Sequence, residues 1–165
     1  MSRAYVGFGS NLGDRETILR DALERLRALG LVVATSSIYE TEPWGKTDQP
    51  AFLNAAAVLE TELDPRALLS ELQRIERELG RERGRDEERW GPRRIDLDLL
   101  LYDERVVSLP GLEVPHPGLA ERAFALVPLA EIAPDAIHPR LGVSIKELAA
   151  RVGGTGVRRS RRGLA

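Results

Sequence analysis

Residues 95–102 constrain the fold of this chain most, because carboxylates and leucines alternate along them. A period of two is the pattern of a β-strand, in which successive side chains point to opposite faces. Asp96 and Asp98 therefore share one face, with their Cα atoms about 7 Å apart. The leucines at 97, 99 and 101 take the other face. The segment is predicted to be a strand that presents two neighbouring carboxylates.

Two carboxylates this close repel each other unless a cation lies between them or they share a proton. Oxygen ligands alone favour magnesium, which keeps several waters and takes substrate phosphates as further ligands. The alternative is a solvated polar face on an edge strand, which is the more common meaning of a bare Asp-x-Asp pair. The residues that precede the pair favour the metal.

Six arginines crowd into residues 81–94, directly before the carboxylate pair. They are Arg81, Arg83, Arg85, Arg89, Arg93 and Arg94. A solvated loop, with its arginines paired to the acidic residues at 82 and 86–88, is one interpretation. The run Trp90-Gly91-Pro92 is unusual for such a loop, because a large aromatic on a turn can cover a planar ligand while Arg93 reaches a phosphate. The combination indicates chemistry on a metal-bound nucleotide.

Composition excludes several other classes of protein. The 165 residues fit one domain, and the absence of cysteine excludes a disulfide framework, a thiolate zinc site and a cysteine nucleophile. A formal net charge of −2 is not that of a chain that coats nucleic acid. No membrane-spanning or signal-peptide pattern is visible, so a cytoplasmic protein without a membrane partner is expected.

Apolar periodicity along the chain indicates alternating strands and helices. Strands are predicted at 4–8, 31–39 and 51–59. Helices are predicted between the turn at 9–14 and Gly30, and at 64–79, 120–127 and 145–152. The arginine-rich residues 153–165 are expected to be a flexible, frayed tail of a single 1–165 domain. The order indicates an α+β fold, with a mostly antiparallel sheet and helices packed on its faces.

Two further groups of side chains could contact a flat ligand. Leu69, Gln73 and Glu76 follow one line of the predicted second helix, although the boundary of the helix core explains their spacing equally well. Phe52 and Asn54 share one face of the strand at 51–59, as an aromatic plate beside an amide. The alternative there is a core aromatic next to a buried, hydrogen-bonded Asn.

Several motifs taken together resemble the 6-hydroxymethyl-7,8-dihydropterin pyrophosphokinase family of folate synthesis. The most specific is Arg-Trp-Gly-Pro-Arg-x-x-Asp-x-Asp at 89–98. It is accompanied by Gly-Ser-Asn-Leu at 9–12, Phe-Leu-Asn-Ala at 52–55, Val-Pro-His-Pro at 114–117 and Glu-Arg-Ala-Phe at 121–124. The resemblance covers residues from about 4 to 150.

The resemblance implies a ferredoxin-like α+β fold in α/β/α layers, and a monomer. It also implies transfer of the pyrophosphoryl group of ATP to the pterin hydroxymethyl oxygen with release of AMP. Two magnesium ions would be held by Asp96 and Asp98, which with Arg81 and Arg93 form the implied catalytic set. The small-molecule partners would be ATP and 6-hydroxymethyl-7,8-dihydropterin.

Binding residues are implied position by position. Those implied for ATP are Leu69, Gln73, Glu76, Arg83, Arg89, Arg93, Leu99, His116 and Arg122. Those implied for the pterin are Thr41, Glu42, Pro43, Trp44, Phe52, Asn54, Trp90 and Phe124. The loop at 80–94 is about two residues longer than in some members, so Arg83 and Arg85 both stay open for one phosphate contact. Phe52 and Pro117 stand where some members have Tyr.

Two rival functions come from other classes of protein. An RNA-recognition domain would need paired aromatics on its central strands, and 6–8 and 99–102 do not supply them. An inactive domain that only senses a metal-bound nucleotide would need no intact Asp96, Asp98 and Arg93, and this chain has all three.

Overall fold

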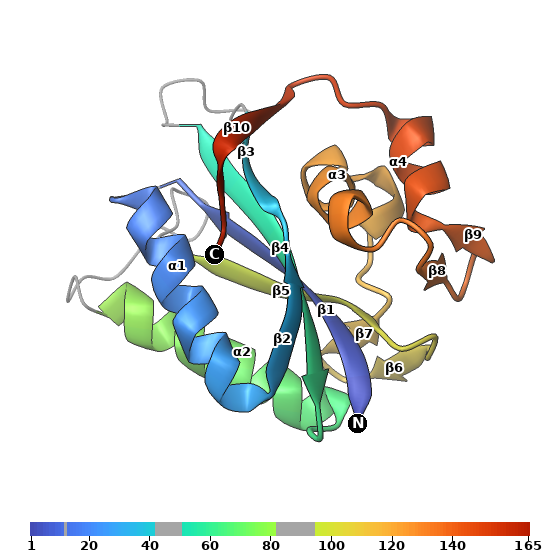
Figure 1. The fold of residues 1–165 in the computed structure, drawn as a ribbon. Coiled ribbons are helices and arrows are strands. Elements are labelled where there is room, and N and C mark those ends of the chain that lie inside the picture. The colour runs from blue at the N-terminus through green and yellow to red at the C-terminus, as the bar shows by residue number, and fades with distance from the viewer. Residues whose placement is uncertain (12, 42–50, 82–94) are drawn as a thin grey trace.

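The computed structural model describes residues 1–11, 13–41, 51–81 and 95–165. Figure 1 shows a twisted central sheet with α1 and α2 on one face and α3 and α4 on the other. Five of the six strands of this sheet follow the order β10-β3-β4-β1-β5, and all pairings are antiparallel. The sixth, β2, pairs with residues 57–60 of β4, whereas β3 pairs with residues 52–54 of the same strand. The strands are β1 (Ser2–Ser10), β2 (Leu31–Thr35), β3 (Ser37–Thr41), β4 (Phe52–Thr61), β5 (Asp96–Tyr102) and β10 (Val157–Gly163). The predicted α+β fold, antiparallel with helices on its faces, is confirmed.

The helices on the first face begin at side-chain caps. α1 (Arg15–Leu26) begins where the carboxylate of Asp14 accepts a 3.3 Å hydrogen bond from the backbone N–H of Thr17. α2 (Pro65–Arg81) begins where Asp64 accepts a 2.8 Å bond from the N–H of Ala67. The predicted apolar face of α2 is buried, as Leu68, Leu72, Ile75 and Leu79 are at most 2% exposed.

Gly30 ends the short turn η1 (Arg27–Leu29) that follows α1. A Cβ at this position would lie 2.1 Å from the carbonyl oxygen of Glu60, a distance that no side chain tolerates. The glycine predicted as a helix cap is therefore needed because two backbones approach each other closely.

Alternation along the strands divides the core into two hydrophobic clusters. Val6, Phe8 and Leu97 belong to the cluster beneath α1 and α2. Ala56 and Leu100 belong to the cluster beneath α3 (Ala123–Ile132) and α4 (Ile145–Val152). Each face of the sheet is thus buried over its middle, and polar side chains reach solvent at strand ends and at the two edges, β5 and β10.

The predicted strand at 31–39 is two strands, β2 and β3, which break at Ser36. The Ser36 hydroxyl accepts a 2.8 Å hydrogen bond from the N–H of Ala56 and donates a 2.7 Å bond to the carbonyl of Ser37. The predicted short helix at 120–127 begins as the turn η2 (Leu119–Glu121) and continues as α3. Two small hairpins, β6–β7 (Val107–Leu109, Leu112–Val114) and β8–β9 (Ile137–His138, Val143–Ser144), were not predicted.

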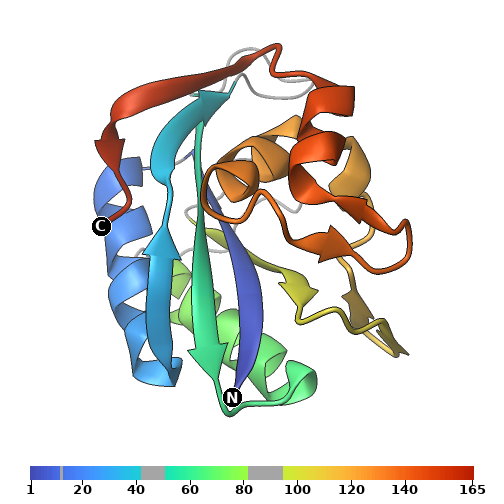
Figure 2. The same cartoon turned by 45° about the vertical axis from the view of Figure 1, so that its right-hand side comes forward.

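Residues 157–163, expected to belong to a frayed tail, form the edge strand β10. Its arginines reach glutamates of three other elements: Arg158 pairs with Glu40, Arg159 with Glu131 and Arg162 with Glu16. Leu164 is fully buried in the cluster beneath α1 and α2. Figure 2 shows β10 running along the outer side of β3. The prediction of a frayed tail is wrong for these residues, because the partners of β10 lie far away in the chain.

The helices within the described ranges include none with the length and apolar character of a bilayer-spanning segment.

Burial of Leu164 predicts that this leucine, rather than the arginines, anchors the C-terminal segment. Leu164→Ala should lower the free energy of unfolding by about 2–4 kcal/mol, because it leaves a cavity in the core. Arg161→Ala, which removes an exposed side chain of the same strand, should cost less than about 0.5 kcal/mol. Urea unfolding followed by circular dichroism measures both; equal losses would contradict the assignment.

Candidate active site

The two carboxylates predicted to face the same way do so at the edge strand β5. In the pairing of β5 with β1, Asp96 lies opposite Gly9 and Asp98 lies opposite Gly7. This face is the one that α3 and α4 cover farther along, because Leu100 follows at the same period and packs with them. Both carboxylates are only half-buried, and the side chain of Asp98 is 41% exposed.

Because the residues opposite the carboxylates are glycines, the sheet surface beside them carries no side chains and forms a flat floor. A Cβ on Gly9 would lie 3.1 Å from Oδ1 of Asn54, and one on Gly7 would lie 3.2 Å from Cδ1 of Leu100. Two carboxylates beside such a floor are a hard-oxygen donor set with room for waters and phosphate oxygens, so they fit magnesium. Among the described residues no cluster of three or more metal-ligating side chains occurs.

His116 lies next to this pair. Its backbone N–H donates a 2.9 Å hydrogen bond to the carbonyl of Leu100, which fixes the segment against β5. Its Nδ1 is 2.7 Å from the carbonyl oxygen of Pro117, so Nδ1 carries the proton. Nε2 then faces Asp98, 3.7 Å from Oδ1. The structure thus brings together two residues implied for the metal and the nucleotide.

A cavity of about 410 Å³ opens at the outer edge of β5. Its walls come from α2, β5, the β6–β7 hairpin and the turn after it, and they include Leu69, Asp98, Leu99 and His116. Four residues implied for ATP or metal binding therefore line one cavity. Leucines on two sides and a carboxylate with an imidazole at one end suit a base with attached phosphates.

Two other α2 residues implied for ATP have different positions. Glu76 accepts a 2.7 Å hydrogen bond from the N–H of Leu97, so it ties the edge strand to α2. Gln73 is exposed and does not line the cavity. The hairpin supplies wall residues that sequence reasoning missed, among them Leu112 and Glu113. The Pro110-Gly111 dipeptide at its turn was the one available indication.

The aromatic and amide side chains predicted on β4 occupy the same face as the carboxylates. Asn54 is 4% exposed, and its Nδ2 donates a 2.8 Å hydrogen bond to Oγ1 of Thr41 on β3. Gly9 lies opposite both Asn54 and Asp96, on its two sides. Asn54, Gly9 and Asp96 thus form one row across the sheet, and Phe52 stands at the half-buried end of the same face.

Phe124 and Arg122 stand at the beginning of α3, on this side of the sheet. The guanidinium carbon of Arg122 lies 5.8 Å from the ring centroid of Phe124, a cation–π distance. Their α3 neighbours Leu126 and Leu129 pack with Ala56, which points the same way as Asn54. The two phenylalanines implied for the pterin are therefore on the same side of the sheet, one on the sheet and one on the helix that covers it.

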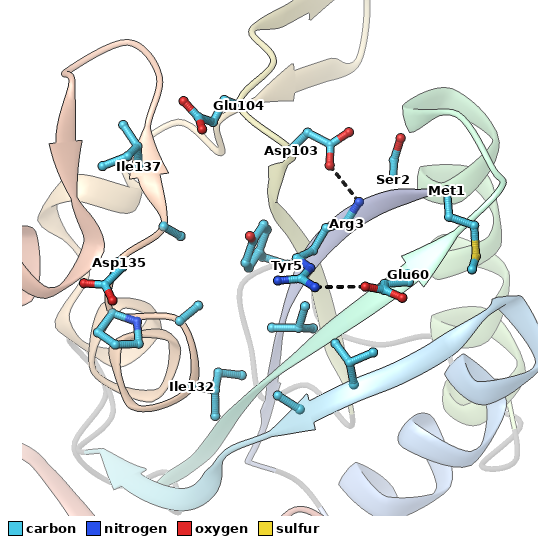
Figure 3. Close-up of a pocket in the computed structure, with 16 residues that line it drawn as sticks. Met1, Ser2, Arg3, Tyr5, Glu60, Asp103, Glu104, Ile132, Asp135 and Ile137 are labelled. Carbon is cyan, nitrogen blue, oxygen red and sulfur yellow. Dashed lines mark hydrogen bonds and ion pairs between the residues drawn. The ribbon is translucent and has the colours of Figure 1, made fainter.

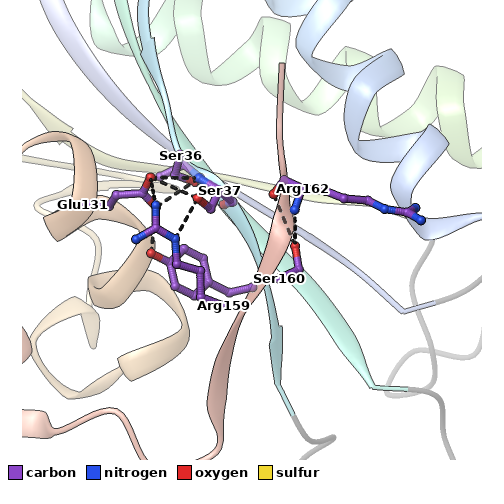
Figure 4. A network of polar contacts seen from close by, with 8 residues as sticks. Ser36, Ser37, Glu131, Arg159, Ser160 and Arg162 are labelled. Atoms are coloured by element: carbon purple, nitrogen blue, oxygen red, sulfur yellow. Dashed lines mark hydrogen bonds and ion pairs between the residues drawn. The ribbon is translucent and has the colours of Figure 1, made fainter.

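A polar network joins the far end of α3 to β3 (Figure 4). The carboxylate of Glu131 accepts hydrogen bonds from the N–H of Ser37 at 3.0 Å and from the hydroxyl of Tyr39 at 2.7 Å. Arg159 of β10 approaches the same carboxylate at 3.3 Å. Burial raises the pKa of Tyr39 to about 12, and the bond to Glu131 acts in the same direction. Sequence reasoning did not find this network.

A larger cavity, of about 900 Å³, lies at the opposite end of the sheet (Figure 3). None of the residues predicted for the site lines it. Arg3, its prominent cation, donates to Glu60 at 2.9 Å from its guanidinium and to Asp103 at 2.8 Å from its backbone. The smaller cavity, not the larger one, is therefore where the predicted residues converge.

Some predicted site residues lie outside the described residues. They are Glu42, Pro43, Trp44, Arg83, Arg89, Trp90 and Arg93. Arg81 is the last residue of α2. Ranges 42–50 and 82–94 adjoin Thr41 and the start of β5 respectively, so they connect directly to the two parts of the site.

Comparisons of the sequence with known proteins point to one family. The family model described as 7,8-dihydro-6-hydroxymethylpterin-pyrophosphokinase (HPPK) matches residues 5–134. A 2-amino-4-hydroxy-6-hydroxymethyldihydropteridine pyrophosphokinase of Methylorubrum extorquens is 50% identical over 161 residues, which are 96% of this chain and 99% of that protein. The enzyme of the same name from Bacillus subtilis is 52% identical over 131 residues, covering 78% of this chain and 77% of the relative.

Solved structures show the same fold. A Plasmodium falciparum HPPK-DHPS triple mutant superposes with a TM-score of 0.72 at 18% identity. The match covers 91% of this chain and 44% of that longer chain.

The raised pKa of Tyr39 predicts a specific alkaline effect. Between pH 10 and about 12 the folded protein keeps this proton whereas the unfolded chain releases it. The stability that the phenol contributes is therefore complete below pH 10 and is lost as the pH rises to 12. The difference in unfolding free energy between wild type and Tyr39→Phe, measured in urea, should shrink across that window. A difference that stays constant throughout would contradict the assignment.

Proposed function

The chain belongs to the 7,8-dihydro-6-hydroxymethylpterin-pyrophosphokinase family and is a pyrophosphokinase of folate synthesis, and on this basis we propose its reaction. The enzyme transfers the β,γ-pyrophosphoryl group of ATP to the hydroxymethyl oxygen of 6-hydroxymethyl-7,8-dihydropterin and releases AMP. One observation supports this most directly: Asp98 lines the cavity at the β5 edge and also belongs to the sheet face that carries Asn54 and Phe52. A carboxylate in that position can lie next to a bound nucleotide and a bound heterocycle at the same time.

The row across the sheet gives the relative placement of the two substrates. Neighbouring strands are about 4.8 Å apart, so Asn54 and Asp96, on either side of Gly9, are separated by about 10 Å. A pterin held at Asn54 and stacked between Phe52 and Phe124 would extend its substituent over Gly9 towards Asp96. The absence of a side chain at Gly9 leaves that path open.

Nucleotide recognition is assigned to the edge cavity. Leu69 and Leu99 provide apolar walls for the base, and His116 contacts the nucleotide at the polar end of the cavity. Arg122 does not line this cavity; from the beginning of α3 it donates to phosphate oxygens in the same proposal. In the same proposal Arg81 and Arg93, with Arg83 or Arg85, hold further phosphate oxygens, Arg89 and Gln73 contact the nucleotide, and Thr41 to Trp44 with Trp90 contact the pterin. We also propose that the enzyme acts as a monomer in the cytoplasm.

Asp96 and Asp98 would hold two magnesium ions. Bound there, magnesium supplies positive charge to the phosphate oxygens and lowers the pKa of the substrate hydroxyl. The hydroxyl oxygen forms a bond to the β-phosphorus, the bond from that phosphorus to the α,β-bridging oxygen breaks, and AMP leaves with that electron pair. In this proposal Asp96 or Asp98 accepts the proton of the hydroxyl. The chain supplies positioning and charge, and no protein nucleophile is required.

The first prediction from this proposal concerns the products. With ATP, magnesium and 6-hydroxymethyl-7,8-dihydropterin, the enzyme should form AMP and the pterin pyrophosphate in equal amounts, measured by ion-exchange chromatography. Omission of either the pterin or the magnesium should abolish AMP. Tight pterin binding without AMP would instead favour a sensor domain, and RNA binding without pterin binding would favour the nucleic-acid alternative.

The second prediction concerns the carboxylates. Asp98→Ala should lower kcat by at least about 10³-fold, because it removes a charge that acts in the transition state. Circular dichroism and the unfolding midpoint should stay near wild type, since the side chain is 41% exposed. Asp135→Ala is the matched control, because this exposed carboxylate, 3.3 Å from Lys146, lines the larger cavity. Wild-type turnover in the Asp98 variant would refute its role.

A further inference from the structure

Glu131 occupies a position from which it can set the geometry of the pterin site without contacting a substrate. It lies in the last turn of α3, and Phe124 lies in the first. Seven residues are close to two full helical turns, so the two side chains share one face of the helix, about 10.5 Å apart along its axis. Since Glu131 bonds to β3, that shared face is the one turned towards the sheet.

The direction of α3 places Phe124 towards the correct end of the sheet. Ile132, the last residue of α3, lines the same cavity as Val58 and Glu60, near the end of β4. The helix therefore advances with β4 from its beginning towards its end. Phe124, two turns earlier, is displaced back towards the beginning of β4, where Phe52 and Asn54 lie.

The carboxylate of Glu131 is held by several donors at once. Ser37 donates its backbone N–H at 3.0 Å to Oε1 and its hydroxyl at 3.1 Å to Oε2. Tyr39, which is 5% exposed, donates at 2.7 Å to Oε1. Arg159 donates at 3.3 Å to Oε2 and also at 3.0 Å to the Ser37 hydroxyl, so β10 closes the network from outside. Charge-assisted bonds of this number fix a side chain firmly.

The β3 residues that Glu131 holds connect directly to the pterin-facing amide. Tyr39 lies opposite Asn54 in the pairing of β3 with β4, and Thr41, two residues farther along, accepts the hydrogen bond from Asn54. Glu131 is thus linked to both sides of the pterin slot, which we define as the space between Phe124 on α3 and Phe52 and Asn54 on the sheet. Through α3 it is linked to Phe124, and through β3 it is linked to Asn54.

We propose that Glu131 is a positioning residue that sets the width of the pterin slot between α3 and the sheet, with Tyr39, Ser37 and Arg159 as its anchors. The inference rests on the proposed function, because it takes Phe52, Asn54 and Phe124 as the pterin contacts. The proposed place of the nucleotide is a different one, the edge cavity between α2, β5 and the β6–β7 hairpin, and Glu131 does not line that cavity.

The test compares the effect of one substitution on the KM for the pterin with its effect on the KM for ATP. Glu131→Gln keeps the size of the side chain but replaces one acceptor oxygen with an NH2 group that faces donors. The KM for 6-hydroxymethyl-7,8-dihydropterin should rise about tenfold, the loss expected for one or two hydrogen bonds to a charged group. The KM for ATP and the Kd of a non-hydrolysable ATP analogue with magnesium should stay within about twofold. Tyr39→Phe should shift the pterin KM in the same direction by less.

Glu16→Gln is the matched control. Glu16 is 19% exposed against 22% for Glu131, and it also binds a β10 arginine, Arg162. It therefore reports the loss of an ion pair that anchors β10, while its own hydrogen bonds go to Arg20 and Arg162 and not to α3 or β3. Its pterin KM should equal that of the wild type, even if its unfolding midpoint falls as much as that of Glu131→Gln.

Several results would overturn the positioning role. They are an unchanged pterin KM in folded Glu131→Gln, an equal rise in both KM values, or an equal pterin effect in Glu16→Gln. Should Glu131→Gln not fold, an unchanged pterin KM in Tyr39→Phe would have the same meaning. Failure of the wild type to form AMP would overturn the proposed reaction instead, and the positioning role would then be decided by the Kd for the pterin alone.

Discussion

The arrangement of the molecule depends on the antiparallel pairing of β1 with β4 on one side and β5 on the other. This central strand aligns residues that are more than forty positions apart in the chain, so that Gly9 lies between Asn54 and Asp96. A shift of one residue in either register would turn all the side chains of the neighbouring strand to the opposite face. The leucines of β5 resist such a shift, since Leu97 and Leu99 are each 4% exposed beneath α2. Hydrophobic burial on one face thus determines where the carboxylates lie on the other.

The site is consequently divided between an edge and a face of one sheet. β5 has an outer edge that pairs with no strand in the part of the chain that the structure describes, and the edge cavity forms there with α2 and the β6–β7 hairpin. The face belongs to β1 and β4, where Ala56 packs beneath α3 and Gly9 leaves the space in which the proposed function places the pterin. Asp98 takes part in both, and this shared position agrees with a family whose members transfer a group between two different substrates.

Local patterns predicted those parts of the fold that burial of one face decides. The strand at 95–102 and the helix of Leu68, Leu72 and Ile75 were both foreseen, because each carries the period of its element. The placement of Leu101 on the face of Leu97 and Leu99 was wrong: the register with β1 shifts at this point, and Leu101 packs with Leu100 on the α3 and α4 side. The break at Ser36 was not, since it depends on a hydrogen bond to Ala56, twenty residues away. Likewise β10 has the local composition of a solvated tail. Three of its arginines pair with glutamates of α1, β3 and α3, which no local window contains.

The pairing of β10 with β3 has a consequence for the synthesis and quality control of the protein. Arg158 and its partner Glu40 are 118 positions apart, so β3 is translated long before the strand that covers its outer side. Until then its unpaired backbone groups are a template on which another chain could add a strand. Nascent or proteolytically shortened chains without residues 157–164 would therefore expose β3 as an unpaired sheet edge that can bind another strand. Such chains would be clients of chaperones that bind extended segments.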